Sequence, residues 1–154
     1  FIGPDNGMGA VIKKKISDAG LSDRIVMTGL LSGADKLTAL AATTIYCHTS
    51  DHEGHSNAIT EALACGKPCV ITEGCNFNRV SEVGAGIVTS SDPNEIANAI
   101  ASILVDTKKC KEMGKNAKQL ASEEYSWSRK ASQMLDVCKW LLGKGDKPEF
   151  VQAD

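Results

Sequence analysis

Two glutamates, Glu53 and Glu61, stand eight residues apart in the stretch "DHEGHSNAITEALACGKPCV" at residues 51–70. Carboxylates accept hydrogen bonds from sugar hydroxyls, whereas the first turn of a helix binds anions through its unpaired amides and its dipole. Both features in one stretch would suit a ligand with a diphosphate between two sugars, such as a nucleotide-sugar. From the spacing alone, the better explanation is a solvated Glu61 and a Glu53 that only adds charge near a helix start.

The loop before the expected helix carries further polar residues. It leads from a β-rich segment at residues 44–50 into a helix expected at residues 56–66. Gly54 would let a ligand approach the backbone closely, because glycine has no side chain. Glu61 follows Asn57 by one turn on the same side of that helix, about 6 Å along its axis. The opposite, buried face is expected to consist of small and apolar residues: Ala58, Ile59, Ala62 and Leu63.

The rest of the chain alternates short apolar runs with amphipathic stretches. Strands are expected at residues 24–29, 44–50, 67–72 and 86–90, and helices at 8–19, 33–43, 56–66, 93–104, 108–123 and 127–142. Asp92, Pro93 and Glu95 form the pattern of an N-cap, a first helical residue and a capping box. This alternation predicts an α/β fold, a Rossmann-like doubly wound parallel sheet with helices on both faces, closed by C-terminal helices. Such sheets bind ligands at the carboxyl ends of their strands, where residues 50–55 would lie.

Composition narrows the class of protein. With 154 residues, 42% hydrophobic and 23% charged, the chain resembles a soluble globular domain with a sizeable core. Its net charge of -2 argues against a nucleic-acid partner. The apolar runs are too short to span a bilayer, and the first residues lack the pattern of a secretory signal. The six cysteines include no C-x-x-C pair and lie mostly in apolar contexts, as expected of small hydrophobic residues in a cytosolic protein.

The sequence "EGHSNAITEALACGKPCVIT" resembles the E-x7-E signature of group 1 (family four) retaining glycosyltransferases of the two-domain GT-B type. The resemblance continues upstream in "GLSDRIVMTGLLSGADKLTALAATTIYCHTSDHEG" and downstream in "SSDPNEIANAIASIL" and "EMGKNAKQLASEEYSWSRKASQMLDVCKWL". It implies that residues 1–142 are an incomplete C-terminal nucleotide-sugar-binding domain, followed by a flexible tail at residues 143–154. The opening "FIGPDNG", which looks like a strand end and the turn after it, leads to the same expectation of a start inside a larger protein.

The resemblance also implies roles for individual residues. Glu53 would contact hydroxyls of the transferred sugar as the candidate catalytic residue, and Glu61 would bind the ribose hydroxyls. Amides at residues 54–57 would hold the diphosphate, and the backbone near Gly29 and Leu30 would flank the base. The implied donor-binding residues are Gly29, Leu30, Ser50, Glu53, Gly54, His55, Ser56, Asn57 and Glu61. No metal and no cofactor are implied besides the substrate, a nucleotide-sugar donor such as a UDP- or GDP-hexose.

The chain departs from the family at three positions. His55 replaces a frequent aromatic residue, and it would either donate a hydrogen bond to the ligand or be a tolerated loop residue. Asn78 and Arg79 stand where the family often has proline and glutamate. The conformation of this loop in the family is therefore not expected to carry over to this chain. The family's diphosphate-clamping arginine and lysine and its acceptor-binding domain lie upstream, so the fragment alone is expected to be inactive.

The parent protein is therefore expected to be a cytoplasmic hexosyltransferase of polysaccharide biosynthesis, with a glycan or glycolipid acceptor bound through its N-terminal domain. A helical stretch rich in lysine would either be solvated or touch anionic lipid at the inner face of the membrane: Lys108, Lys109, Lys111, Lys115 and Lys118. Trp127 and Trp140 are expected to pack the last helix onto the sheet. Two alternatives remain: an epimerase-like domain, for which only His52 and His55 offer additional acid–base groups, and a non-catalytic Rossmann-like interaction module.

Overall fold

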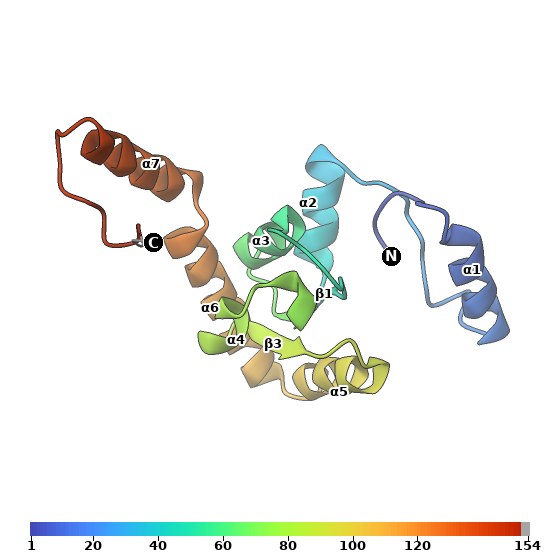
Figure 1. Cartoon of the computed structure of the whole chain (residues 1–154). Coiled ribbons are helices and arrows are strands. Elements are labelled where there is room, and N and C mark those ends of the chain that lie inside the picture. The colour runs from blue at the N-terminus through green and yellow to red at the C-terminus, as the bar shows by residue number, and fades with distance from the viewer. Residues whose placement is uncertain (152–154) are drawn as a thin grey trace. The chain divides into compact units, whose positions relative to one another are not determined.

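The computed structural model describes residues 1–151, which form two compact units, one at Phe1–Ala39 and the other from Leu40 onward (Figure 1). The first unit contains α1 (Gly9–Asp18), and α2 (Gly33–Ala42) carries the chain into the second. The Asp5 carboxylate accepts hydrogen bonds from the amides of Gly9 and Gly7, each 2.9 Å long. These two hydrogen bonds lower the pKa of Asp5 and order the turn that leads into α1.

The strand expected at residues 24–29 is wrong. The first unit has one parallel bridge between Ile2 and Gly29, where the Gly3 amide donates to the Gly29 carbonyl over 2.9 Å, and residues 25–28 belong to no strand. Phe1 adds two further backbone hydrogen bonds, since its amino group donates to the Val26 carbonyl over 2.6 Å and its carbonyl accepts from the Thr28 amide over 3.0 Å. Residues 26–29 thus run beside the first residues of the chain without forming a regular strand. Val26, within the expected strand, is 68% exposed.

The second unit is built around a parallel sheet. Its strands are β1 (Tyr46–His48), β2 (Cys69–Thr72) and β3 (Gly86–Thr89), with β2 in the centre and every residue of β2 buried. Tyr46 lies opposite Cys69, and Cys69 lies opposite Gly86. The helices are α3 (Asn57–Ala64), the 3-10 turn η1 (Glu73–Cys75), α4 (Arg79–Glu82), α5 (Pro93–Leu104), α6 (Thr107–Glu124) and α7 (Trp127–Leu141). The predicted α/β fold with a helix-flanked parallel sheet is confirmed.

Side chains of β2 alternate between two cores, because successive residues of a strand point to opposite faces. Cys69 and Ile71 pack with buried residues of α3, α4 and α6, whereas Val70 packs with buried residues of α5 and with Met113 of α6. Figure 1 shows α5 on the opposite side of the sheet from α3. Helices therefore cover both faces, as the doubly wound prediction requires.

The predicted start of α5 is confirmed with one change in its hydrogen bonds. The Asp92 side chain caps the helix by accepting from the amides of Asn94 and Glu95, and Pro93 is the first helical residue. The Glu95 carboxylate accepts from the amide and hydroxyl of Ser90, at 3.2 and 2.7 Å, in place of the Asp92 amide that a capping box would use. The Asp92 amide instead donates to the Ser90 hydroxyl over 3.2 Å.

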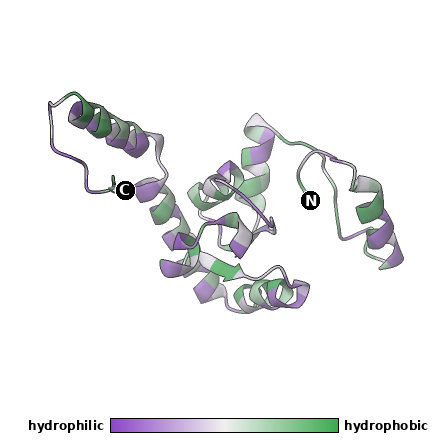
Figure 2. Ribbon diagram, in the orientation of Figure 1, coloured by the Kyte–Doolittle hydropathy of each residue, from purple (hydrophilic) through white to green (hydrophobic). Residues whose placement is uncertain are grey.

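The last helix does not provide the packing expected of its tryptophans. α7 has no buried residue among those described, Trp127 is 89% exposed, and Trp140 is half-buried with the Lys147 ammonium 5.7 Å from its ring centroid. Hydrophobic and hydrophilic residues are interleaved along α7 (Figure 2). The expectation for Trp127 is wrong, because it is the first residue of α7, directly after the cap Ser126, and its side chain lies in solvent.

Beyond α7, residues 143–151 form neither helix nor strand. Residues 152–154 of the expected tail lie outside the described part of the chain. Among residues 1–151, no helix combines the length and apolar character needed to cross a membrane.

Candidate functional site

The loop at residues 49–56, between β1 and α3, is held in place by the segment that follows β2. The amide of Glu53 donates to the Gly74 carbonyl over 2.8 Å, and the Asn76 side-chain amide donates to the Glu53 carbonyl over 2.8 Å. The Thr72 hydroxyl donates to the Ser50 carbonyl over 2.6 Å. The backbone at Ser50 and at Glu53, two of the predicted site residues, is thus fixed from one side.

Close packing of backbone reinforces these hydrogen bonds. A Cβ atom at Gly74 would collide with the carbonyl oxygen of Asp51, so only glycine allows this approach. Asn76 adopts the left-handed conformation with φ 55°, which turns the chain after η1. From the loop after β3, the Ser91 hydroxyl donates to the Asp51 carboxylate over 2.9 Å. Loops after all three strands therefore meet at the carboxyl end of the sheet.

The Glu53 carboxylate contacts a residue that the sequence did not single out. Its Oε1 lies 3.0 Å from Nε2 of His48, and the two side chains are 29% and 24% exposed. The other ring nitrogen of His48, Nδ1, lies 3.0 Å from the Tyr46 hydroxyl. The available signal was the period of two along β1, which places Tyr46 and His48 on the same face of the strand.

The Tyr46 phenol is the third member of this group. Burial raises the pKa of Tyr46, and neighbouring thiols and the Glu61 carboxylate raise it further. The raised pKa keeps the phenol protonated and able to donate a hydrogen bond.

The start of α3 lies open beside Glu53. Ser56 occupies the N-cap and is only 5% exposed, but its side chain makes no capping hydrogen bond. Gly54, His55 and Asn57 are exposed, and a Cβ atom built at Gly54 meets no atom within 4 Å. The side chain of Ser56 therefore does not accept a hydrogen bond from the first amides of α3.

The body of α3 follows the predicted amphipathic pattern. Ile59, Ala62 and Leu63 are buried, while Ala58 is half-buried. The helix ends in a Schellman motif, with Gly66 at φ 68°, the Gly66 amide bonded to the Leu63 carbonyl and the Lys67 amide bonded to the Ala62 carbonyl.

Glu61 lies off the buried face of α3, as predicted, and is half-buried. It lines a pocket of about 390 Å³ that also takes in residues of α6 and α7. Tyr125 and Trp127 provide the aromatic part of this lining, and Lys118 provides a cation.

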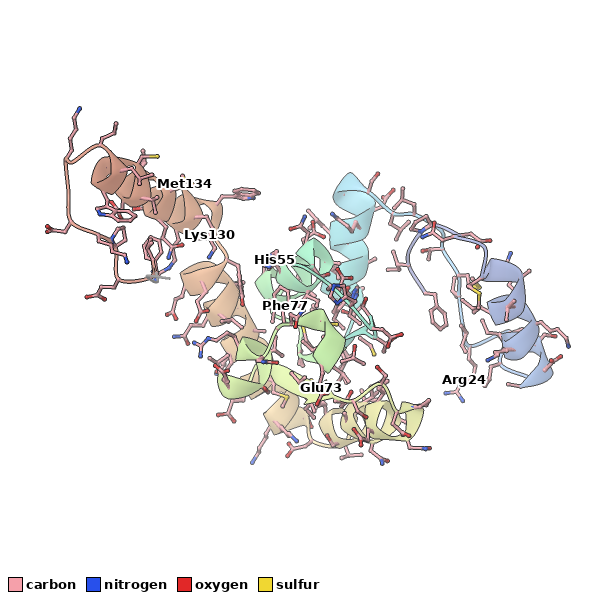
Figure 3. All side chains as sticks on the ribbon, in the orientation of Figure 1. Arg24, His55, Glu73, Phe77, Lys130 and Met134 are labelled. Atoms are coloured by element: carbon pink, nitrogen blue, oxygen red, sulfur yellow. The ribbon has the colours of Figure 1, made fainter. Side chains whose placement is uncertain are left out.

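His55 packs in an aromatic cluster with Phe77 and Tyr125. Its ring centroid lies 4.9 Å from that of Phe77 and 5.8 Å from that of Tyr125, and the Lys130 ammonium is 5.9 Å from the Tyr125 centroid. Figure 3 shows His55 and Phe77 side by side. The His55 ring is thus in contact with two aromatic side chains.

Arg79 and Asn78, the other two departures, belong to the segment around α4. Asn78 is the N-cap position and Arg79 the first residue of this short helix. The Arg79 guanidinium pairs with Glu124 over 2.6 Å and with Glu82 over 2.7 Å. These contacts tie α4 to the end of α6, and the hydrogen bonds from Arg79 lower the pKa of Glu124.

Gly29 and Leu30, the residues expected to flank a base, belong to the first unit. Gly29 has a φ of 71° and forms the bridge to Ile2, and Leu30 is 72% exposed. Within residues 1–151, no three or more His, Cys, Asp and Glu side chains are grouped so that they could hold a metal ion. Burial raises the pKa of the Cys69 thiol to about 12, as expected of a cysteine that serves as a small hydrophobic residue.

The sequence and the structure of the chain were compared with those of known proteins. The family model of the glycosyl transferases group 1 matches residues 1–120. The chain is 29% identical over 137 residues to the MMP alpha-(1->4)-mannosyltransferase of Mycolicibacterium hassiacum, covering 86% of this chain and 33% of that protein. Among solved structures, it matches Anabaena Alr3699/HepE in complex with UDP and glucose at a TM-score of 0.78 and 27% identity, covering 90% of this chain and 39% of that one.

Sucrose-phosphate synthase from Thermosynechococcus elongatus gives the same TM-score of 0.78 at 25% identity, covering 92% of this chain and 38% of that one. The chain thus spans about a third of the length of the mannosyltransferase and somewhat more of each solved structure. Because the family model matches most of its residues, the chain belongs to the glycosyl transferases group 1.

Proposed function

We propose that this chain binds the nucleotide-diphosphate-sugar donor of a retaining glycosyltransferase, which transfers a hexosyl unit to a glycan or glycolipid acceptor. The observation that carries the proposal is the position of Glu53, held at backbone and side chain beside an open Gly54 and the uncapped start of α3. Membership of the family supports it. So do the names of the relatives, one a mannosyltransferase and another in complex with UDP and glucose.

Each part of the site would bind one part of the donor. Glu53 accepts hydrogen bonds from hydroxyls of the transferred sugar, and Glu61 accepts them from the ribose. The amides of α3, reached over Gly54, hold the diphosphate. The remaining donor-binding residues of the proposal in the second unit are Ser50, His55, Ser56 and Asn57.

The α3 terminus also gives the site its chemical role. When the bond between sugar and diphosphate breaks, negative charge grows on the leaving diphosphate. The α3 amides and the helix dipole stabilise that charge, as a divalent cation does in other transferases. The proposal therefore includes neither a metal nor a cofactor.

The acceptor belongs to another part of the parent enzyme in this proposal. That enzyme is cytoplasmic and reaches a lipid-linked acceptor at the inner face of the membrane. The exposed lysines of α6, Lys108 and Lys109 among them, supply positive charge for anionic lipid headgroups.

Nucleotide titration tests the proposal. UDP, GDP and ADP are added separately to the isotopically labelled chain, and the amide resonances of Glu53, Gly54 and Glu61 are followed by NMR. One of the three should shift these resonances in a saturable way. Glu53→Gln and Glu61→Gln should weaken binding of the matching nucleotide-sugar, whereas Glu112→Gln, at an exposed carboxylate of α6, serves as the control and should not. If the complete parent enzyme responds to no nucleotide, the proposal is wrong and a non-catalytic interaction module is favoured.

A further inference from the structure

Tyr46, His48 and Glu53 form a continuous chain of hydrogen bonds, which we call the Tyr–His–Glu relay. The Tyr46 hydroxyl lies 3.0 Å from Nδ1 of His48, and Nε2 of His48 lies 3.0 Å from Oε1 of Glu53. The Tyr46 and His48 rings are nearly parallel, with an interplanar angle of 18°. All three residues are partly buried, so water competes less with these contacts than it does on an open surface.

The chemistry of the groups gives the relay a direction. An ionised carboxylate can only accept, so Nε2 of His48 carries the hydrogen that is donated to Glu53. In the neutral imidazole Nδ1 is then an acceptor, and the Tyr46 hydroxyl donates to it. Burial raises the pKa of Tyr46, which supports the phenol as a permanent donor in this arrangement.

The relay is anchored at its far end. Tyr46 packs against the core cluster that contains Ile59 and Ile71, and its amide donates to the Pro68 carbonyl over 2.9 Å. At the near end, the backbone of Glu53 is fixed by Gly74 and Asn76. The main chain and one carboxylate oxygen of Glu53 are therefore both held by ordered parts of the second unit.

We propose that His48 and Tyr46 are positioning residues that orient the Glu53 carboxylate for the sugar part of the donor. His48 engages Oε1, which leaves lone pairs of the carboxylate for sugar hydroxyls. A carboxylate held before the ligand arrives loses less conformational entropy on binding. This inference rests on the proposed function, because it assigns the relay to the sugar-binding part of that site.

The test compares the affinities for a nucleoside diphosphate and for the corresponding nucleotide-sugar. Isothermal titration of the full chain with UDP and UDP-glucose, and with GDP and GDP-mannose, gives the ratio of the two affinities. Tyr46→Phe and His48→Leu should lower the sugar-dependent gain in affinity by roughly 3- to 10-fold, the usual effect of losing one hydrogen bond in such a network. Affinity for the diphosphate alone and the melting temperature should stay close to those of the wild type.

Two further variants separate positioning from structure. His48→Gln places a side-chain amide donor near the position of Nε2. It should therefore restore part of the ratio between the affinities for the nucleotide-sugar and for the nucleoside diphosphate. Cys47→Ser changes the exposed residue between Tyr46 and His48 on the same strand and should leave the ratio unchanged. A merely structural role would instead lower the melting temperature and both affinities together.

The outcomes distinguish the two proposals. A wild-type chain and parent enzyme that bind no nucleotide would contradict the proposed function. Binding by the wild type with an unchanged ratio in Tyr46→Phe and His48→Leu would overturn the positioning role alone. A second measurement needs no ligand. The ¹⁵N chemical shifts of the His48 ring should show a protonated Nε2 and an unprotonated Nδ1. In Glu53→Ala the shifts of the two nitrogens should move toward each other, because the two tautomers then interconvert. Averaged shifts in the wild type would contradict the relay.

Discussion

Glycine has two different roles around the loop that follows β1. At Gly74 the missing side chain is a packing requirement, because a Cβ atom there would collide with the Asp51 backbone. At Gly54 nothing within 4 Å opposes a Cβ atom, and φ lies outside the left-handed region. Folding therefore does not require glycine at position 54, whereas the proposed approach of the donor diphosphate over this residue would.

Exchanging each glycine for alanine should separate these roles. Gly54→Ala is expected to change the free energy of unfolding by less than about 0.5 kcal/mol. It should weaken nucleotide binding roughly tenfold, or ~1.4 kcal/mol, because its methyl group occupies the ligand's approach. Gly74→Ala should cost about 1–3 kcal/mol of stability through overpacking and should weaken binding as well. Urea unfolding and calorimetric titration measure both effects, and full affinity in Gly54→Ala would contradict the proposed diphosphate site.

The helices of the second unit differ in how they begin. Side chains of Asp92, Asp106 and Ser126 accept hydrogen bonds from first-turn amides of α5, α6 and α7. Ser56 makes no such bond at α3, the helix that starts at the candidate site. A helix terminus left without a side-chain cap is less stable but keeps its amides for a ligand.

Removal of the N-cap side chains tests this difference. Asp92→Ala should lower the free energy of unfolding by about 1 kcal/mol, because two amides lose their acceptor. Ser56→Ala should cost clearly less, because its side chain provides no cap to lose. Urea titrations with equal m-values would report both changes. An equal loss in the two variants would show that Ser56 caps α3 in solution.

On the scale of the molecule, the chain accounts for about a third of the mannosyltransferase it resembles. Its second unit has a complete core on both faces of the sheet, formed by two clusters of buried residues. Apolar residues of α7 remain exposed, among them Met134 and Leu141. The donor site proposed above is one half of a transferase, since transfer also requires an acceptor held against the sugar.

The isolated chain should therefore bind a nucleotide-sugar without transferring the sugar. Chromatographic assay of released UDP or GDP should show no turnover by this chain with an added glycan or glycolipid acceptor. The parent enzyme should turn over under the same conditions, and its Glu53→Gln variant serves as the inactive control. Sugar transfer by residues 1–154 alone would contradict this prediction.

The sequence by itself determined the elements whose signals are local. The buried run of β2, the amphipathic α3 closed by Gly66 and the Asp92 cap of α5 were all predictable, because periodicity and capping depend on neighbouring residues. Tertiary structure decided what depends on distant partners. It paired Gly29 only with Ile2, where a longer strand was expected, and it left Trp127 in solvent. It also brought the segment after β2 against the loop at residues 49–56 and joined His48 to Glu53, because pairing, burial and side-chain contact depend on parts of the chain that meet only on folding.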